Sequence, residues 1–167
     1  MSNILEPDIY VNSILDIPLD RLQQLHIKAF ILDLDNTLTE WNSNELKDEI
    51  VAWFEQIKSR GLKACILSNN GEQRVITVAQ RLGIPYLFRA QKPRRRAFRQ
   101  AVALMELTAS EVAVIGDQIF TDILGGNRAG LFTILVVPIA KREFIGTKIS
   151  RCMEFFVLHR LRRKFKL

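Results

Sequence analysis

The chain has 167 residues, of which 48% are hydrophobic, and this is enough apolar material for one ordinary domain with a sizeable core. No stretch of about 20 consecutive apolar residues occurs, which excludes a membrane-spanning helix, and the first residues lack the basic start and apolar core of a signal peptide, so we expect a cytoplasmic protein. The net charge is +6, but residues 1–140 hold 15 Lys and Arg against 16 Asp and Glu, so all of the excess positive charge lies in residues 141–167.

Apolar runs alternate with helical patterns along the middle of the chain. In chain order we predict a strand at 28–34, a helix at 44–60, a strand at 62–68, a helix that ends at Gly83, a strand at 84–88, a helix from Pro93 to about Leu107, a strand at 112–117, a helix near 120–129 and a strand at 131–137. Cys65 lies inside the second apolar run and is expected in the core.

Unbroken apolar strands that alternate with helices indicate a parallel sheet with right-handed crossovers. We therefore predict an α/β fold, in which helices cover both faces of a doubly wound, mostly parallel five-stranded sheet. Residues 1–147 are expected to form this domain, and residues 148–167 to form a basic amphipathic C-terminal segment.

Polar and charged residues follow four of the predicted strands. In such sheets, ligands bind outside the carboxyl ends of the strands. The residues found there are Asp33, Asp35 and Thr37 after the first strand, Ser68, Asn69 and Asn70 after the second, Lys92 after the third, and Asp117 and Asp122 after the fourth. Two carboxylates held close together need compensation by positive charge, so this edge predicts a functional site.

These motifs resemble those of a known superfamily. D-x-D-x-T after an apolar strand, then Ser, then Lys, then G-D-x-x-x-x-D is similar to the haloacid dehalogenase-like phosphatases, over the stretch from Phe30 to about Val137. The segments DLDNTL, LSNN, QKP and GDQIFTDILGGNR resemble the YqeG-like, subfamily IIIA branch, which includes enzymes that dephosphorylate phosphatidylglycerophosphate. The resemblance implies a phosphoric monoester hydrolase that uses Mg²⁺ and an aspartyl-phosphate intermediate.

The resemblance also implies a role for each motif residue. Asp33 is the expected nucleophile, Asp35 the expected general acid and base, and Lys92 a positive charge beside the phosphate. The side chains expected to bind phosphoryl oxygens are Thr37, Ser68 and Asn69. Mg²⁺ is expected on Asp33, the main-chain carbonyl of Asp35 and Asp117. Asp122 is expected to orient Lys92 or a metal-bound water, and a helix cap is the alternative.

The intervals between the motifs leave no room for a cap domain. Thr37 and Ser68 are separated by 30 residues, Ser68 and Lys92 by 23, and predicted helices and strands occupy both intervals. An open site of this kind can reach a phosphate on a molecule too large to enclose, such as a lipid, a protein or a nucleic-acid end.

The C-terminal segment 148–167 combines apolar residues at helical spacing with a basic end. Such a segment can lie at the interface of an anionic membrane, and a helix packed on the domain with solvated charges is the alternative. A second basic cluster adjoins the third motif and can bind lipid head groups; it consists of Lys92, Arg94, Arg95, Arg96 and Arg99. Aromatic residues do not interleave with these charges, so no nucleic-acid partner is expected.

The leading hypothesis is a peripheral membrane phosphatase that hydrolyses phosphatidylglycerophosphate to phosphatidylglycerol. The first alternative keeps the chemistry but changes the substrate to a protein, a nucleic-acid end or a soluble phosphometabolite. The second is a catalytically silent, membrane-associated binding protein, against which the intact Asp33 and Asp35 pair argues. His26 and His159 lie away from the motif edge and are assigned no catalytic role.

Overall fold

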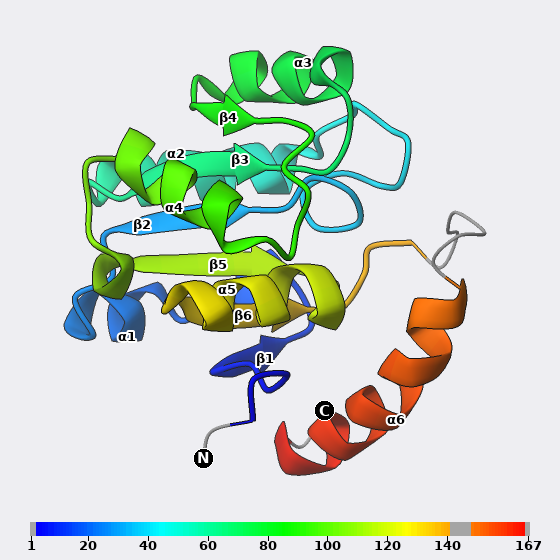
Figure 1. Cartoon of the computed structure of the whole chain (residues 1–167). Coiled ribbons are helices and arrows are strands. Elements are labelled where there is room, and N and C mark those ends of the chain that lie inside the picture. The colour runs from blue at the N-terminus through cyan, green and yellow to red at the C-terminus, as the bar shows by residue number, and fades with distance from the viewer. Residues whose placement is uncertain (1–2, 141–147, 166–167) are drawn as a thin grey trace.

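The structure, a computed structural model, describes residues 3–140 and 148–165, with the side chains of the last helix from residue 157 onward. Six strands form one parallel sheet (Figure 1). They are β1 (Ile9–Val11), β2 (Ala29–Leu32), β3 (Lys63–Leu67), β4 (Tyr86–Leu87), β5 (Val112–Gly116) and β6 (Phe132–Val136). Their order across the sheet is β1-β6-β5-β2-β3-β4.

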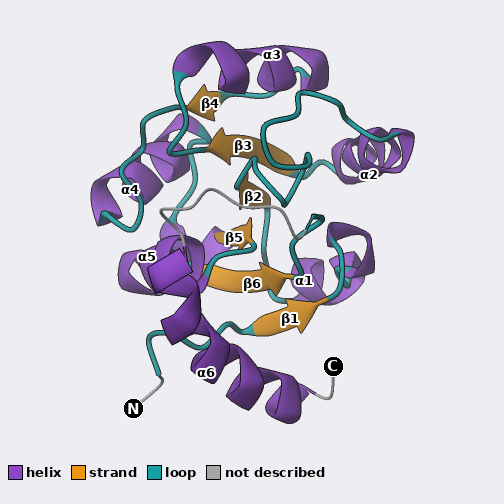
Figure 2. Cartoon of the chain, turned by 90° about the vertical axis from the view of Figure 1, so that its right-hand side faces the viewer, coloured by secondary structure: helices purple, strands orange, loops and turns teal. Residues whose placement is uncertain are grey.

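Helices cover both faces of the sheet, as predicted (Figure 2). The α-helices of the domain are α1 (Leu19–Gln24), α2 (Asp48–Ser59), α3 (Glu72–Leu82), α4 (Arg95–Leu104) and α5 (Leu124–Ala129). The domain also contains three short helical turns: the 3-10 turns η1 (Ile14–Asp16) and η2 (Ala109–Glu111) and the π-helical turn η3 (Ile119–Ile123). The first three α-helices pack on one face, whereas α4 and α5 pack on the other.

The central strand β2 is buried on both faces. Phe30 and Leu32 pack toward the layer of α2 and α3, and Ala29 and Ile31 pack toward α4. All four residues are fully buried, which is why this strand reads as an unbroken apolar run instead of an alternating one. Burial of each larger side chain contributes about 1.5–3 kcal/mol relative to exposure.

The sheet has six strands, where the sequence predicted five. The additional strand, β1, lies at the edge and pairs only with β6, with Ile9 opposite Ile134. Its three residues are too few to show a periodic pattern, so only the pairing with β6 defines it. The six-residue helix α1 escaped prediction for the same reason, and α4 begins at Arg95, two residues later than expected.

The chain order creates a crevice at the centre of the sheet. From β2 the chain proceeds through β3 to β4 on one side, and then crosses back to β5 and β6 on the other. Ligands of doubly wound sheets bind at such a reversal, outside the carboxyl ends of the strands. The described residues between the first three motifs form α2, β3, α3 and β4, and no cap domain is inserted among them.

The last helix, α6 (Lys148–Phe165), packs against the domain beside β1 and η3 (Figure 2). Leu161 is buried against Tyr10, Ile119 and Ile123, and the Phe165 ring meets the Tyr10 ring edge-on at 6.3 Å between centroids. In the described half of the helix, the apolar side chains therefore face the domain. This is the packed arrangement raised above as the alternative, and membrane attachment of 148–167 stays a prediction.

The basic side chains in the described half of α6 are exposed. They are Arg160, Arg162, Arg163 and Lys164, the last of which forms an ion pair with Glu6. No helix in the described ranges has the length and apolarity needed to cross a membrane.

Candidate active site

A cluster of buried carboxylates lies in the crevice between β2 and β5. Asp33 directly follows β2, and its N–H donates to the Ile115 carbonyl oxygen of β5 at 2.9 Å, which holds the two strand ends together. Asp117 directly follows β5, and Asp122 lies one turn further on in η3. All three side chains are buried, and one carboxylate oxygen of each lies within 4.8 Å of the other two.

Lys92 joins two of these carboxylates. Its Nζ donates to Asp33 Oδ1 at 2.7 Å and to Asp122 Oδ1 at 2.6 Å, and its side chain is only 3% exposed. Asn69 holds the main chain of Lys92 from the neighbouring strand end: Oδ1 accepts from the Lys92 N–H at 2.7 Å, and Nδ2 donates to the Lys92 carbonyl oxygen at 3.4 Å. Asn69 thus positions Lys92 here, and its contact with phosphate stays a prediction.

The electrostatics of the cluster follow from burial. Burial raises the pKa of Asp33 to about 6, with Asp122 acting in the same direction and Lys92 opposing it. Burial alone would lower the pKa of Lys92, but the carboxylates of Asp122 and Asp33 outweigh it and raise that pKa above its usual value. Lys92 is therefore a permanent ammonium group.

The donor set fits a hard divalent cation. Three carboxylates face a single ammonium group, so the cluster has spare negative charge, and carboxylate oxygens are the ligands that such cations prefer. Asp33 and Asp117, the two expected metal-binding carboxylates, both belong to it. Asp122 is the third member, although the sequence predicted it beside the metal and not as a ligand. Ligation by the Asp35 carbonyl stays a prediction.

Asp122 has two side-chain contacts, and its role beside a metal stays a prediction. Oδ1 accepts from Lys92, whereas Oδ2 accepts from the N–H of Gln118, four residues earlier, at 3.2 Å. Gly116 makes this placement possible, because a Cβ atom there would overlap the Asp122 carboxyl group. The glycine before Asp117 is thus required for close approach.

Asp35 lies at the mouth of the site and faces α3. Its carboxylate forms an ion pair with Arg74 and accepts from Asn70 Nδ2 and, at 3.3 Å, from the Asn42 N–H. The sequence placed Asn70 at the end of the second strand but predicted no role for it, and sequence reasoning missed Arg74. The signal available was their position, because they follow the second strand end and occupy the loop and first turn before the body of α3.

The two hydroxyl side chains expected to bind phosphate are both buried at this edge. Thr37 Oγ1 donates to Asp117 Oδ1 at 3.4 Å, and Ser68 Oγ accepts from the Asn70 N–H at 3.1 Å. Their contact with phosphoryl oxygens stays a prediction. The two histidines, His26 and His159, are exposed, whereas Cys65 is buried in the core as expected.

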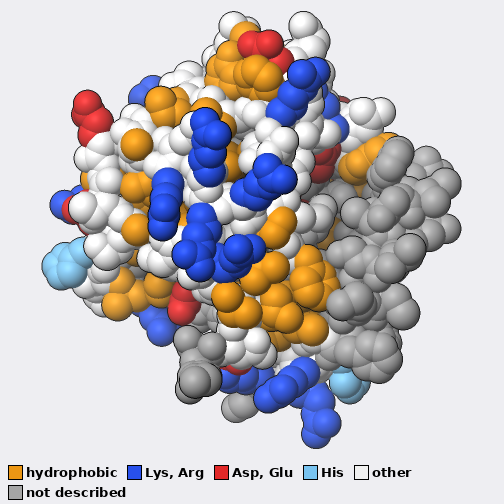
Figure 3. All heavy atoms as spheres, viewed as in Figure 1, with side chains coloured by type: hydrophobic (Ala, Val, Ile, Leu, Met, Phe, Trp, Pro, Cys, Tyr) orange, Lys and Arg blue, Asp and Glu red, His pale blue; other side chains and the backbone are white. Residues whose placement is uncertain are grey.

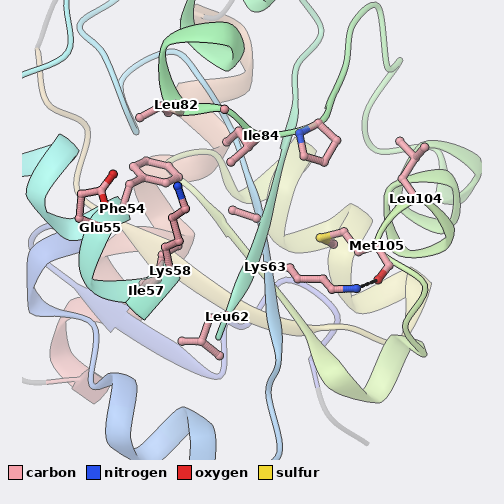
Figure 4. Close-up of a pocket in the computed structure, with 13 residues that line it drawn as sticks. Phe54, Glu55, Ile57, Lys58, Leu62, Lys63, Leu82, Ile84, Leu104 and Met105 are labelled. Carbon is pink, nitrogen blue, oxygen red and sulfur yellow. Dashed lines mark hydrogen bonds between the residues drawn. The ribbon is translucent and has the colours of Figure 1, made fainter. Parts of the chain in front are cut away.

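An apolar groove of about 360 Å³ lies at the amino ends of β3 and β4, on the side of the sheet opposite to the carboxylate cluster (Figure 4). We call this side the amino edge and the side of the cluster the carboxyl edge. Lys63, the first residue of β3, lines it and donates from Nζ to the Met105 carbonyl oxygen at 2.8 Å. The phosphate-site candidate Ser68 follows the other end of the same strand. The groove is therefore separate from the carboxylate cluster.

Comparison with known proteins identifies the family. The sequence model of the haloacid dehalogenase-like hydrolases matches residues 40–130. The probable phosphatase YqeG of Bacillus subtilis (strain 168) is 44% identical over 158 residues, which span 95% of this chain and 92% of that protein. The chain belongs to the haloacid dehalogenase-like hydrolases. It is a phosphoric monoester hydrolase, and the predicted resemblance to this superfamily and its YqeG-like branch is confirmed.

More distant relatives extend the comparison. The chloroplastic/mitochondrial phosphatidylglycerophosphate phosphatase 1 of Arabidopsis thaliana is 29% identical over 95% of this chain, which spans only 48% of that protein. Among solved structures, the cobalt-bound deoxy-D-mannose-octulosonate 8-phosphate phosphatase of Haemophilus influenzae superposes with a TM-score of 0.56 at 19% identity, over 68% of this chain and 71% of that one. The structural likeness supports the shared fold.

Proposed function

We propose that this haloacid dehalogenase-like hydrolase is a Mg²⁺-dependent phosphatase that acts through an aspartyl-phosphate on Asp33, with phosphatidylglycerophosphate at a membrane surface as its substrate. The observation that carries the catalytic proposal is the buried group of Asp33, Asp117 and Asp122 with Lys92 Nζ between two of its members. A buried carboxylate at the end of a central strand, oriented by an ammonium group, suits a nucleophile that attacks phosphorus.

In the first step an oxygen of Asp33 forms a bond to phosphorus while the bond from phosphorus to the leaving oxygen breaks. Asp35 gives its proton to that leaving oxygen. In the second step Asp35 takes a proton from water, the water oxygen attacks phosphorus, and the Asp33–phosphorus bond breaks to release phosphate. Mg²⁺ held by Asp33 and Asp117, with Asp122 beside them, would supply positive charge to the phosphoryl oxygens.

The chain's own residues prepare these steps. Lys92 keeps Asp33 oriented and offsets the negative charge that repels an incoming phosphate. Arg74 and Asn70 hold the Asp35 carboxylate at the mouth, where a leaving group exits. The hydroxyls of Thr37 and Ser68 lie beside Asp117 and Asn70, and are proposed to turn toward the phosphoryl oxygens when substrate binds.

The proposed substrate rests on the relatives and on the open site. Phosphatidylglycerophosphate phosphatases of Arabidopsis thaliana and Chlamydomonas reinhardtii align with most of this chain, at 29% and 27% identity. The absence of a cap among the described residues suits a head group presented by a large assembly. We propose a cytoplasmic protein that associates peripherally with anionic membranes, in part through the exposed basic residues of 148–167.

Phosphate release from a panel of substrates tests this function. The full-length protein with Mg²⁺ should release phosphate from phosphatidylglycerophosphate in vesicles faster than from phosphopeptides, 5′-phosphorylated oligonucleotides or sugar phosphates. Asp33→Asn serves as the inactive control for each substrate. A preference for any soluble substrate would remove the lipid proposal and retain the phosphatase, whereas no release from any monoester would contradict both.

A further inference from the structure

Two exposed aromatic side chains flank the mouth of the site. Trp41 is 40% exposed and Phe88 is 36% exposed. Trp41 lies in the loop after β2, next to Asn42, whose N–H donates to the Asp35 carboxylate. Each of them leaves apolar surface in water.

Phe88 is linked to Asp35 through Arg89 and Asn70. It follows β4 and precedes Arg89, whose N–H donates to the Asn70 carbonyl oxygen at 2.9 Å. The side chain of Asn70 in turn donates to the Asp35 carboxylate. Trp41 and Phe88 are therefore each one residue away from a segment that contacts Asp35 or its partner Asn70.

Two exposed arginines follow Phe88 closely in the sequence. Arg89 and Arg94 are exposed, and neither forms an ion pair with an acidic residue of the described ranges; Arg94 Nη1 donates to Gln91 Oε1 at 2.7 Å. Figure 3 shows further Lys and Arg side chains gathered over α4. We call Trp41, Phe88, Arg89 and Arg94 the mouth rim.

The basic end of α6 lies beside the edge strand β1. Arg160 and Lys164 line a hollow together with Gly130 and Leu131, which precede the amino end of β6. Lys164 also pairs with Glu6, which precedes β1. A membrane held by these charges alone would contact the β1 side of the domain, whereas the carboxylate cluster lies at the ends of β2 and β5.

We infer that the mouth rim is the surface that docks on a phospholipid bilayer, with Trp41 and Phe88 at the interface and Arg89 and Arg94 on anionic head groups. The inference rests on the proposed lipid substrate and assigns its binding surface. Tryptophan rings are favoured at the membrane–water interface, phenylalanine rings bury apolar surface there, and basic side chains add attraction to anionic lipid. In this orientation a lipid phosphate reaches Asp33 without leaving the bilayer.

The charges near Trp41 favour a bilayer over a nucleic acid. Glu40 and Glu45 are exposed on that side of the mouth, so a continuous chain of phosphates that crosses the site from the arginines would meet like charge, whereas a mixed bilayer can place zwitterionic head groups there. Platforms for single-stranded nucleic acid place aromatic rings along a basic groove, whereas Trp41 and Phe88 stand on separate loops.

Tryptophan fluorescence offers a direct test, because the chain has only two tryptophans and Trp53 is 4% exposed in the core. Vesicles of phosphatidylglycerol and phosphatidylcholine, which carry no monoester, should shift the emission of Trp41 to shorter wavelength. Lipids with brominated acyl chains should quench it, and Trp41→Phe should remove both effects. Vesicle binding with unchanged Trp41 emission would overturn the inference.

Charge and apolar variants test the remaining rim. The double variant Arg89→Glu, Arg94→Glu should weaken vesicle binding at least about 25-fold, or about fivefold for each basic residue, and Phe88→Ser should also weaken it. Hydrolysis of soluble p-nitrophenyl phosphate should be unchanged. Arg81→Glu and Leu104→Ser, which alter exposed residues near the other edge of the sheet, are the matched controls and should bind like the wild type.

The outcomes separate this inference from the proposed function. Rim-dependent vesicle binding without turnover of lipid phosphate would support the docking surface and contradict the lipid substrate. If vesicle binding depended on Arg160, Arg162 and Arg163 and not on the rim, the docking surface would be wrong while the substrate proposal stood. A Trp41 response to single-stranded RNA but not to vesicles would also overturn it.

Discussion

Lys92 provides most of the positive charge that compensates the buried carboxylates of Asp33 and Asp122. Two unpaired carboxylates in a buried crevice would repel each other, and each would lose hydration. A single ammonium group within 2.7 Å of both Asp33 and Asp122 offsets this cost before any cation binds. Because breaking a buried pair costs about 3–5 kcal/mol, Lys92 supports folding as well as the proposed chemistry.

The first residue-scale prediction concerns the proposed nucleophile. Asp33→Asn should lower phosphate release at least about a thousandfold, because the amide has the shape of the carboxylate but cannot attack phosphorus. Lys92 keeps Asp122 as a partner, so the variant should stay folded. Steady-state kinetics and circular dichroism measure the two results. Asp16→Asn, at an exposed position, is the control, and substantial activity in folded Asp33→Asn would exclude this nucleophile.

The second concerns Gly116. A methyl group in Gly116→Ala would overlap the Asp122 carboxyl group, so Asp122 must move and Lys92 must follow. We expect a loss of about 1–3 kcal/mol in the free energy of unfolding together with a loss of turnover. Gly71→Ala is a matched control, because a Cβ there meets no atom within 4 Å. Urea denaturation and kinetics check both variants, and normal turnover in Gly116→Ala would mean that the placement of Asp122 does not matter.

At the scale of elements, the contact between α6 and η3 links the C-terminal helix to the site. Ile119 and Ile123 of η3 lie under Leu161 of α6, and η3 also carries Asp122. A helix that only attached the protein to lipid would leave the site unaffected when removed. In this arrangement α6 instead covers part of the core next to the carboxylate cluster.

Leu161→Ala tests that link. Removing this buried side chain should lower the free energy of unfolding by about 2–5 kcal/mol, and hydrolysis of a small soluble monoester should fall because η3 loses its support. Arg162→Ala on the exposed side of the helix should have little effect on either quantity. Chemical denaturation and kinetics provide the measurements. Unchanged stability in Leu161→Ala would show that α6 does not pack on the domain in solution.

At the scale of the molecule, the sheet separates two regions of different character. The carboxyl edge holds the carboxylate cluster and the mouth rim, whereas the amino edge holds the apolar groove (Figure 4). The fold itself produces this division, because parallel strands bring every carboxyl end to the same edge.

Metal binding gives a prediction at this scale. Mg²⁺ should raise the melting temperature, since a ligand that binds only the folded state adds about 2.7 kcal/mol at a hundredfold excess over its dissociation constant. A chelator should abolish both the shift and the turnover. Asp117→Asn should weaken the shift, and Glu49→Gln on an exposed helix surface should not. Differential scanning calorimetry records the shift, and turnover in metal-free buffer would contradict the metal requirement.

The sequence alone determined the class of fold and the family. Long apolar runs ending in Asp33, Ser68 and Asp117 predict buried parallel strands, because only strands covered on both faces can be apolar throughout. The same spacing predicted that polar residues would meet at one edge and that no cap would intervene. These features depend on local pattern and on the order of elements along the chain.

Only the tertiary structure decided which side chains touch. The contacts of Lys92 with Asp122, and of Asp35 with Arg74 and Asn70, join residues far apart in sequence, and no local pattern encodes such distances. The strand β1 exists because β6 offers an edge to pair with. The packing of Leu161 on η3 depends likewise on an apolar surface that several elements build together, which is why amphipathicity alone could not distinguish a membrane partner from the domain itself.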